Sequence, residues 1–94
     1  MAEMNNEALL SALKLDLGIS SVAFNGRLLS RIRAAQARIK EEGVILEDTI
    51  EDQELVVMYA AYLWRERVSG EDMPRMLRYA LNNRLFAQKA REVL

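Results

Sequence analysis

The spacing of apolar residues along the chain predicts four helices separated by polar or glycine-containing breaks. The first spans about residues 6–17, with Asn5 or Asn6 as its N-cap and Gly18 in the left-handed position that ends many helices. The second begins between residues 21 and 26 and ends before residue 43. Its apolar positions recur every three or four residues, at Leu28, Ile32, Ala35 and Ile39.

The third predicted helix is unusual because its middle has no polar face. It begins at Asp48 or Thr49, where Thr49 and Asp52 form a pair typical of helix starts, and it runs to about Val68. All the residues from 55 to 64 are apolar. A helix that is apolar on every side does not lie on the surface of a monomer, so we expect it at the centre of a bundle or shared with a neighbouring subunit.

The fourth predicted helix follows Asp72, has Pro74 in its first turn and continues to about Arg91. Its pattern gives it two apolar faces. One face carries Met73, Leu77, Ala80, Leu81 and Leu85. The opposite face carries two aromatic residues seven positions apart, and monomers seldom leave such aromatics together in water. We therefore expect a second chain to contact that face through these candidate interface residues: Met76, Tyr79, Asn82, Asn83 and Phe86.

Arg84 lies within the first of these faces, among leucines. A guanidinium in such a position needs a carboxylate or several carbonyl groups as partners, so we predict a buried ion pair at Arg84.

The segment between the second and third helices, residues 44–46, is apolar but too short for a helix, and no partner strand exists elsewhere in the sequence. We expect it to be an extended connector that packs on the core. The elements together predict an all-α fold, a small bundle of four or at most five helices with short connections, in a single domain of residues 1–94.

The composition removes most catalytic chemistry. The chain has 94 residues, no cysteine and no histidine. Without these residues it has no thiolate nucleophile, lacks the usual general base at neutral pH and has few ligands for transition metals. We therefore expect no enzymatic activity, cofactor, metal or small-molecule substrate. The first residues show no secretion signal, and the longest apolar run is about half of a membrane span, so we expect a soluble protein with no membrane partner.

Acidic residues gather between positions 41 and 54, a stretch that contains no basic residue. They could bind a divalent cation or face a basic partner. The stretch lacks the alternating oxygen ligands and central glycine of a calcium-binding loop. We favour the interpretation that these acids belong to a solvated connector and to the start of the third helix.

The second helix carries a group of basic residues with no acid among them: Arg27, Arg31, Arg33, Arg38 and Lys40. Arg27, Arg31 and Arg38, which we call the basic strip, fall within about 40° of one another around the helix. This strip could follow a phosphate backbone, or it could flank the core and meet the acidic stretch of the same or a neighbouring chain. The net charge of −1 favours the second interpretation.

The apolar run of the third helix contains three aromatic residues, Tyr59, Tyr62 and Trp64. They could form a stacking platform for bases, but their apolar surroundings favour core or interface positions, with at least two of them in the core.

Four segments, which together cover most of the chain, carry a resemblance to a known family: residues 9–19 (LLSALKLDLGI), 28–39 (LLSRIRAAQARI), 52–61 (DQELVVMYAA) and 73–86 (MPRMLRYALNNRLF). In these segments and in their order, the chain resembles the small all-helical head-tail connector (adaptor) proteins of long-tailed bacteriophages. None of the segments is a catalytic signature, and what they share with the family is their packing pattern.

The resemblance implies a structural subunit that assembles with copies of itself into a ring below the portal and joins the DNA-filled head to the tail. It implies the portal protein and tail-side adaptor or stopper proteins as partners, with DNA only passing through the ring lumen. It also implies that the protein is made in the bacterial cytoplasm and ends in the virion neck. The alternative is a small DNA-binding or regulatory helical domain that uses the basic strip.

Overall fold

The structure, a computed structural model, describes residues 4–69 and 72–93, and these form helices and connecting segments with no strand among them. The elements in chain order are α1 (Asn6–Leu17), a short 3-10 helix η1 (Val22–Phe24), α2 (Asn25–Glu41), α3 (Ile50–Ser69) and α4 (Arg75–Val93). The predicted all-α fold with four helices and short connections is confirmed, and η1 is a brief addition ahead of α2.

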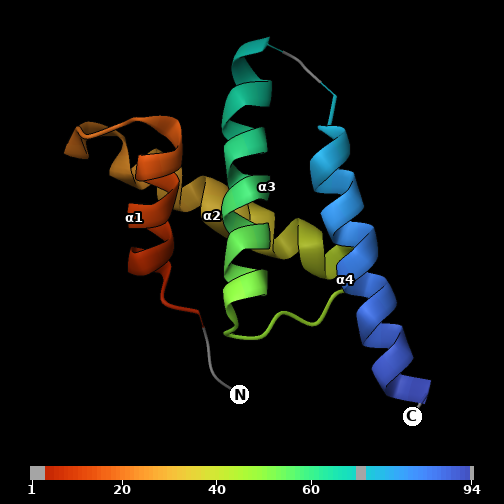
Figure 1. The fold of residues 1–94 in the computed structure, drawn as a ribbon. Coiled ribbons are helices and arrows are strands. Elements are labelled where there is room, and N and C mark those ends of the chain that lie inside the picture. The colour runs from red at the N-terminus through yellow and green to blue at the C-terminus, as the bar shows by residue number, and fades with distance from the viewer. Residues whose placement is uncertain (1–3, 70–71, 94) are drawn as a thin grey trace.

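Helix α3 is the centre of the bundle. Figure 1 shows α1, α3 and α4 side by side, with α2 crossing behind them. Because α3 packs against α1, α2 and α4, its wholly apolar middle is explained by contacts within one chain. The central position, one of the two roles expected for this helix, is therefore observed.

The ends of α1 follow from local chemistry. The Asn5 side chain accepts hydrogen bonds from the backbone N–H groups of Glu7 and Ala8 at 3.0 and 3.2 Å. At the other end Gly18 has a φ of 71°, which residues with a Cβ seldom adopt, and its N–H bonds back to the Leu15 carbonyl. Both positions agree with the sequence-based prediction, with Asn5 as the cap.

The start of α4 differs slightly from the predicted start. Pro74 precedes the helix instead of lying in its first turn, and its carbonyl accepts hydrogen bonds from the N–H groups of Leu77 and Arg78 at 3.1 Å. Pro74 therefore takes the capping position, where only its carbonyl is needed and its missing N–H costs nothing.

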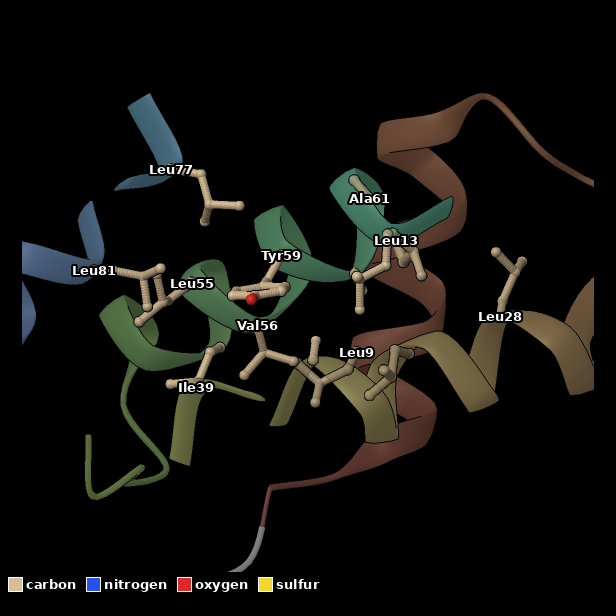
Figure 2. Close-up of a cluster of buried hydrophobic side chains, with 14 of the residues drawn as sticks. Leu9, Leu13, Leu28, Ile39, Leu55, Val56, Tyr59, Ala61, Leu77 and Leu81 are labelled. Carbon is tan, nitrogen blue, oxygen red and sulfur yellow. The ribbon is translucent and has the colours of Figure 1, made fainter. Parts of the chain in front are cut away.

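The core is formed by one side of each helix around α3 (Figure 2). Leu9 and Leu13 come from α1, and Leu77 and Leu81 come from α4; all four are at most 3% exposed. The connector between α2 and α3 contributes Val44, which is 1% exposed, as expected for an extended segment packed on the core. The apolar face predicted for α4 is therefore its core face.

The aromatic residues of α3 pack against the protein rather than forming an open platform. Tyr59 is buried, while Tyr62 and Trp64 are half-buried against the core. The Tyr59 and Tyr62 rings meet edge to face with their centroids 5.9 Å apart, and Trp64 meets Phe24 in the same way at 5.9 Å. These contacts agree with core packing for Tyr59, whereas Tyr62 and Trp64 lie at the margin of the core, so one residue and not the expected two is fully inside it.

Burial of Tyr59 predicts a loss of stability at alkaline pH. Removal from water raises the pKa of the Tyr59 phenol above its ordinary value, and the Arg38 guanidinium opposes this rise in part. Above about pH 10 the unfolded chain loses this proton first, so the stabilisation present at lower pH is lost as pH rises through the folded-state pKa. Urea unfolding at about pH 9 to 11 measures the free energy of unfolding, which should decrease less steeply with pH in Tyr59→Phe than in the wild type. The exposed Tyr79→Phe is the matched control, and an unchanged slope in Tyr59→Phe would contradict the prediction.

Candidate interaction surface

The candidate interface residues of α4 lie in water on the side of the helix opposite the core. Met76, Tyr79 and Phe86 are 72%, 66% and 76% exposed, and Asn82 and Asn83 are also exposed. We call these five residues the α4 stripe. Leu77 and Leu81 of the same helix are buried, so α4 has one apolar face in the core and a second that nothing in the monomer covers. The predicted placement of these residues is therefore what the structure has.

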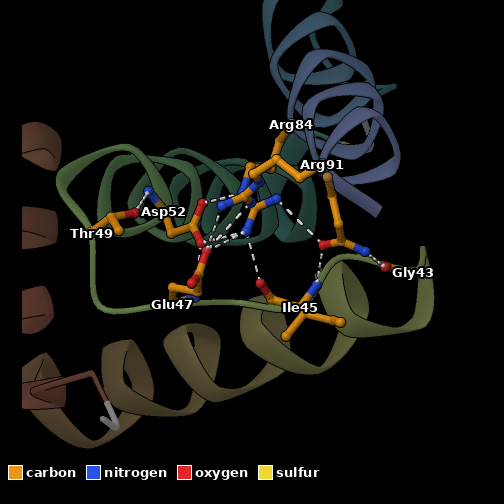
Figure 3. A network of polar contacts seen from close by, with 8 residues as sticks. Gly43, Ile45, Glu47, Thr49, Asp52, Arg84 and Arg91 are labelled. Atoms are coloured by element: carbon orange, nitrogen blue, oxygen red, sulfur yellow. Dashed lines mark hydrogen bonds and ion pairs between the residues drawn. The ribbon is translucent and has the colours of Figure 1, made fainter. Parts of the chain in front are cut away.

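The orientation of the stripe is fixed by Arg84, which lies on the opposite side of α4 (Figure 3). Its side chain is 12% exposed, and its Nε and Nη2 donate to the two carboxylate oxygens of Asp52 at 2.6 and 3.1 Å. Nη2 also donates to the Ile45 carbonyl at 2.8 Å. The predicted buried ion pair of Arg84 thus uses both kinds of partner that the sequence suggested, a carboxylate and a carbonyl.

Asp52 was expected among the acids at the start of the third helix, and it lies there. It is also 1% exposed, a burial that the sequence interpretation did not include. Its N–H donates to Thr49 Oγ1 at 3.2 Å, as in the predicted start of the helix, while its carboxylate accepts from the N–H of Glu47 at 2.8 Å and from Arg84. The Arg84 side chain replaces the water that would otherwise solvate this carboxylate.

Gln88, one turn beyond Arg84 on the same face, completes the attachment of the connector and was not identified from the sequence. Its Nε2 donates to the Gly43 carbonyl at 2.8 Å, and its Oε1 accepts from the N–H of Ile45 at 2.8 Å. A glutamine four residues after a buried arginine on an apolar face was the available signal. The side chains of Arg84 and Gln88 therefore hold the connector against α4.

The Asp52 carboxylate also affects the titration of its partner. The hydrogen bond to Asp52 raises the pKa of Arg84 above its ordinary value, and this outweighs the opposing effect of burial. The Arg84 guanidinium is positive at every pH at which the protein is folded, so the attachment does not depend on its protonation.

Of the six other acids of the 41–54 stretch, two pair with α4. Glu42 Oε1 lies 2.8 Å from Arg78 Nη1, and Glu47 Oε1 lies 3.4 Å from Arg84 Nη2 and 3.5 Å from Arg91 Nη2. The Glu42 carboxylate raises the pKa of Arg78 through this hydrogen bond. These two acids and Asp52 therefore attach the stretch to α4. The exposed Glu41, Asp48, Glu51 and Glu54 form no ion pair with a described residue, which agrees with the interpretation that we favoured, a solvated connector followed by helix-start acids. No group of three or more acids in the described part of the chain could hold a metal ion.

The basic strip of α2 does not meet that acidic stretch within the chain. Arg27 and Arg38 are exposed and Arg31 is half-buried, and none of the three forms an ion pair with a described carboxylate. The same holds for the exposed Arg33 and Lys40. We considered three roles for the basic strip, and one of them was pairing with the acidic stretch of the same chain. The described residues do not show this pairing.

Searches for similar proteins gave no family to which the chain can be assigned. No family model, no curated protein and no solved structure matches it. Among the described residues, no helix is both long enough and apolar enough to cross a membrane.

Proposed function

We propose that this chain is a structural subunit of a bacteriophage or prophage head-tail connector, one of several copies in a ring below the portal that joins the DNA-filled head to the tail. The resemblance of the four sequence segments motivates this proposal. The observation that supports it best is the two-faced α4, whose exposed stripe is held in one orientation by the Arg84 and Gln88 contacts. A rigid exposed apolar face suits a protein whose work is to contact other proteins.

The other features of the chain fit the same role. Arg78 and Arg84 of α4 form ion pairs that fix the fold, and the sequence has no cysteine or histidine. In this role the protein binds further copies of itself, the portal protein and tail-side adaptor or stopper proteins. DNA passes through the lumen, and the finished location is the virion neck.

The decisive experiment is reconstitution on the portal protein encoded by the same phage genome. Portal rings mixed with the purified chain are imaged by electron microscopy and sedimented. A collar of added density at one end of the portal, with the chain in the pellet, is the expected result. Unchanged portal rings, with all of the chain left in the supernatant, would overturn the connector proposal.

Placing a charge in the α4 stripe should weaken assembly far more than folding. Tyr79 is 66% exposed, so Tyr79→Glu loses no core contact and its free energy of unfolding should stay within about 0.5 kcal/mol of the wild type. A buried carboxylate in an apolar contact between subunits is costly, so the collar should be lost. Thermal unfolding and the reconstitution assay measure the two effects, with Tyr79→Phe as control. A sharply lower melting temperature together with normal assembly would contradict the placement of Tyr79.

A second candidate function is a small DNA-binding or regulatory domain. The observation in its favour is that the basic strip forms no ion pairs with the described acids, so its charges are available to phosphates. Mobility-shift titration of duplex DNA over a range of salt concentrations tests it. Binding that falls steeply with salt and is lost in a variant with Arg27 and Arg38 changed to glutamine would favour this function, and no retained DNA at low salt would remove it.

A further inference from the structure

A second apolar surface lies in the groove between α1 and α3. The groove has a volume of about 410 Å³, and its walls include Ala8 and Ala12 from α1 and Ile50, Val57 and Met58 from α3. Ile50 is 74% exposed and Met58 is 38% exposed. Small residues on one wall leave room for a large side chain from outside, and apolar residues on the other wall favour such a contact.

The charged residues of this groove are acidic. Asp16 and Glu54 line it, and no lysine or arginine does. Asp16 lies 3.8 Å from Arg65 in an exposed ion pair, while Glu54 has no ion-pair partner among the described residues. Apart from the neutral Asn5 and Gln53, the α1–α3 groove therefore combines apolar residues with negative charge.

The α4 stripe has the complementary character. Phe86 and Tyr79 project large side chains into water, and the exposed Arg75 and Lys89 flank them. From residue 75 to residue 91 the sequence contains no acid at all. The stripe is therefore apolar in the middle and positive at its edge, and it matches the groove in both respects.

We infer that the α4 stripe of one copy of this chain docks in the α1–α3 groove of the next copy. This inference rests on the proposed function, because it specifies how the subunits of the ring contact each other. Helices α1 and α4 flank α3 (Figure 1), so the groove between α1 and α3 and the stripe on α4 are two different surfaces of each copy. A contact between two different surfaces repeats from copy to copy and closes into a ring when the rotation per copy permits.

The test uses one variant for each surface. Ala12→Arg fills the groove and adds a positive charge to it, and Phe86→Glu places an acid in the stripe; both positions are exposed, so the fold should be retained. Ser11→Arg, at an exposed position on another side of α1, is the control for the first variant. Phe86→Leu, which keeps the stripe apolar, is the control for the second. Circular dichroism confirms folding, and light scattering coupled to size exclusion measures mass over a wide concentration range.

The wild type and both controls should form a discrete species of several copies, and each of the two surface variants alone should have the monomer mass of 10.8 kDa. A mixture of Ala12→Arg and Phe86→Glu should give a species of twice that mass, because one intact stripe meets one intact groove and neither remaining surface can extend the chain.

Three outcomes would overturn the inference. Normal assembly of Ala12→Arg would exclude the groove, and a mixture that stays monomeric would exclude a stripe-to-groove contact. A wild type that is monomeric at all concentrations would exclude docking between free copies. None of these results decides whether the chain forms a collar on the portal, so failure of the inference and failure of the connector proposal are separate observations.

Discussion

Replacing Asp52 with alanine should lower the free energy of unfolding by about 3 to 5 kcal/mol, the largest effect that we expect from a single substitution. The Asp52 carboxylate is 1% exposed and accepts hydrogen bonds from Arg84 and from the Glu47 N–H. Without this carboxylate, the Arg84 side chain, which is 12% exposed, still has the Ile45 carbonyl and the exposed Glu47 as partners. These groups do not replace a buried bidentate carboxylate. Urea unfolding followed by circular dichroism measures the loss.

Two control variants isolate the buried charge as the cause. Glu47→Ala removes a carboxylate that is 51% exposed and should cost less than about 1 kcal/mol. Adding Arg84→Met to Asp52→Ala removes the unpaired charge and should recover most of the lost stability. A loss below about 1 kcal/mol for Asp52→Ala, or no recovery in the double variant, would show that the Asp52–Arg84 pair does not hold the connector and α4 together.

The need of Arg84 for a partner could be predicted from the sequence, but the identity of the partner could not. Helical periodicity placed Arg84 among the leucines of one face, and the cost of burying an unpaired charge then required a carboxylate or carbonyls. Which of the seven acids between residues 41 and 54 would serve depends on how the connector folds back against α4. That path is set by contacts between residues more than thirty positions apart, for which local pattern carries no information.

The helices themselves were predicted well because each has a local cause. Periodic apolar residues, the Asn5 cap and the left-handed Gly18 define α1, and the start of α3 follows Thr49. The start of α2 was left between residues 21 and 26, and the structure shows why: η1 winds directly into α2, and no side chain caps the junction at Phe24. An uncapped start leaves no signal in the sequence.

The structure changes how the charges of this protein bear on its function. The sequence suggested that the acidic stretch and the basic strip of α2 might meet each other, within one chain or between neighbours. Glu42, Glu47 and Asp52 are engaged with α4, whereas the exposed Glu54 of the α1–α3 groove forms no ion pair with a described residue and remains for a contact between subunits. The basic strip of α2 is accordingly a surface separate from the acidic stretch. The DNA titration and the reconstitution on portal rings distinguish binding to DNA from assembly as a connector.

The second large effect should come from the core face of α4. Leu81 is 2% exposed, so Leu81→Ala removes buried methyl groups and leaves a cavity, at a cost of about 2 to 5 kcal/mol. Met76 on the same helix is 72% exposed, and Met76→Ala should change stability by no more than about 0.5 kcal/mol. The urea midpoints of the two variants give the difference in their free energies of unfolding, provided that the dependence of that free energy on urea concentration is the same in both. Because the two substitutions differ in the face of α4 that they alter, equal losses would mean that α4 is rotated about its axis from the described orientation, and the α4 stripe would then belong to the core. A loss confined to Leu81→Ala leaves Met76, Tyr79 and Phe86 free for contacts outside the monomer, which is the condition that both the connector proposal and the docking of copies require.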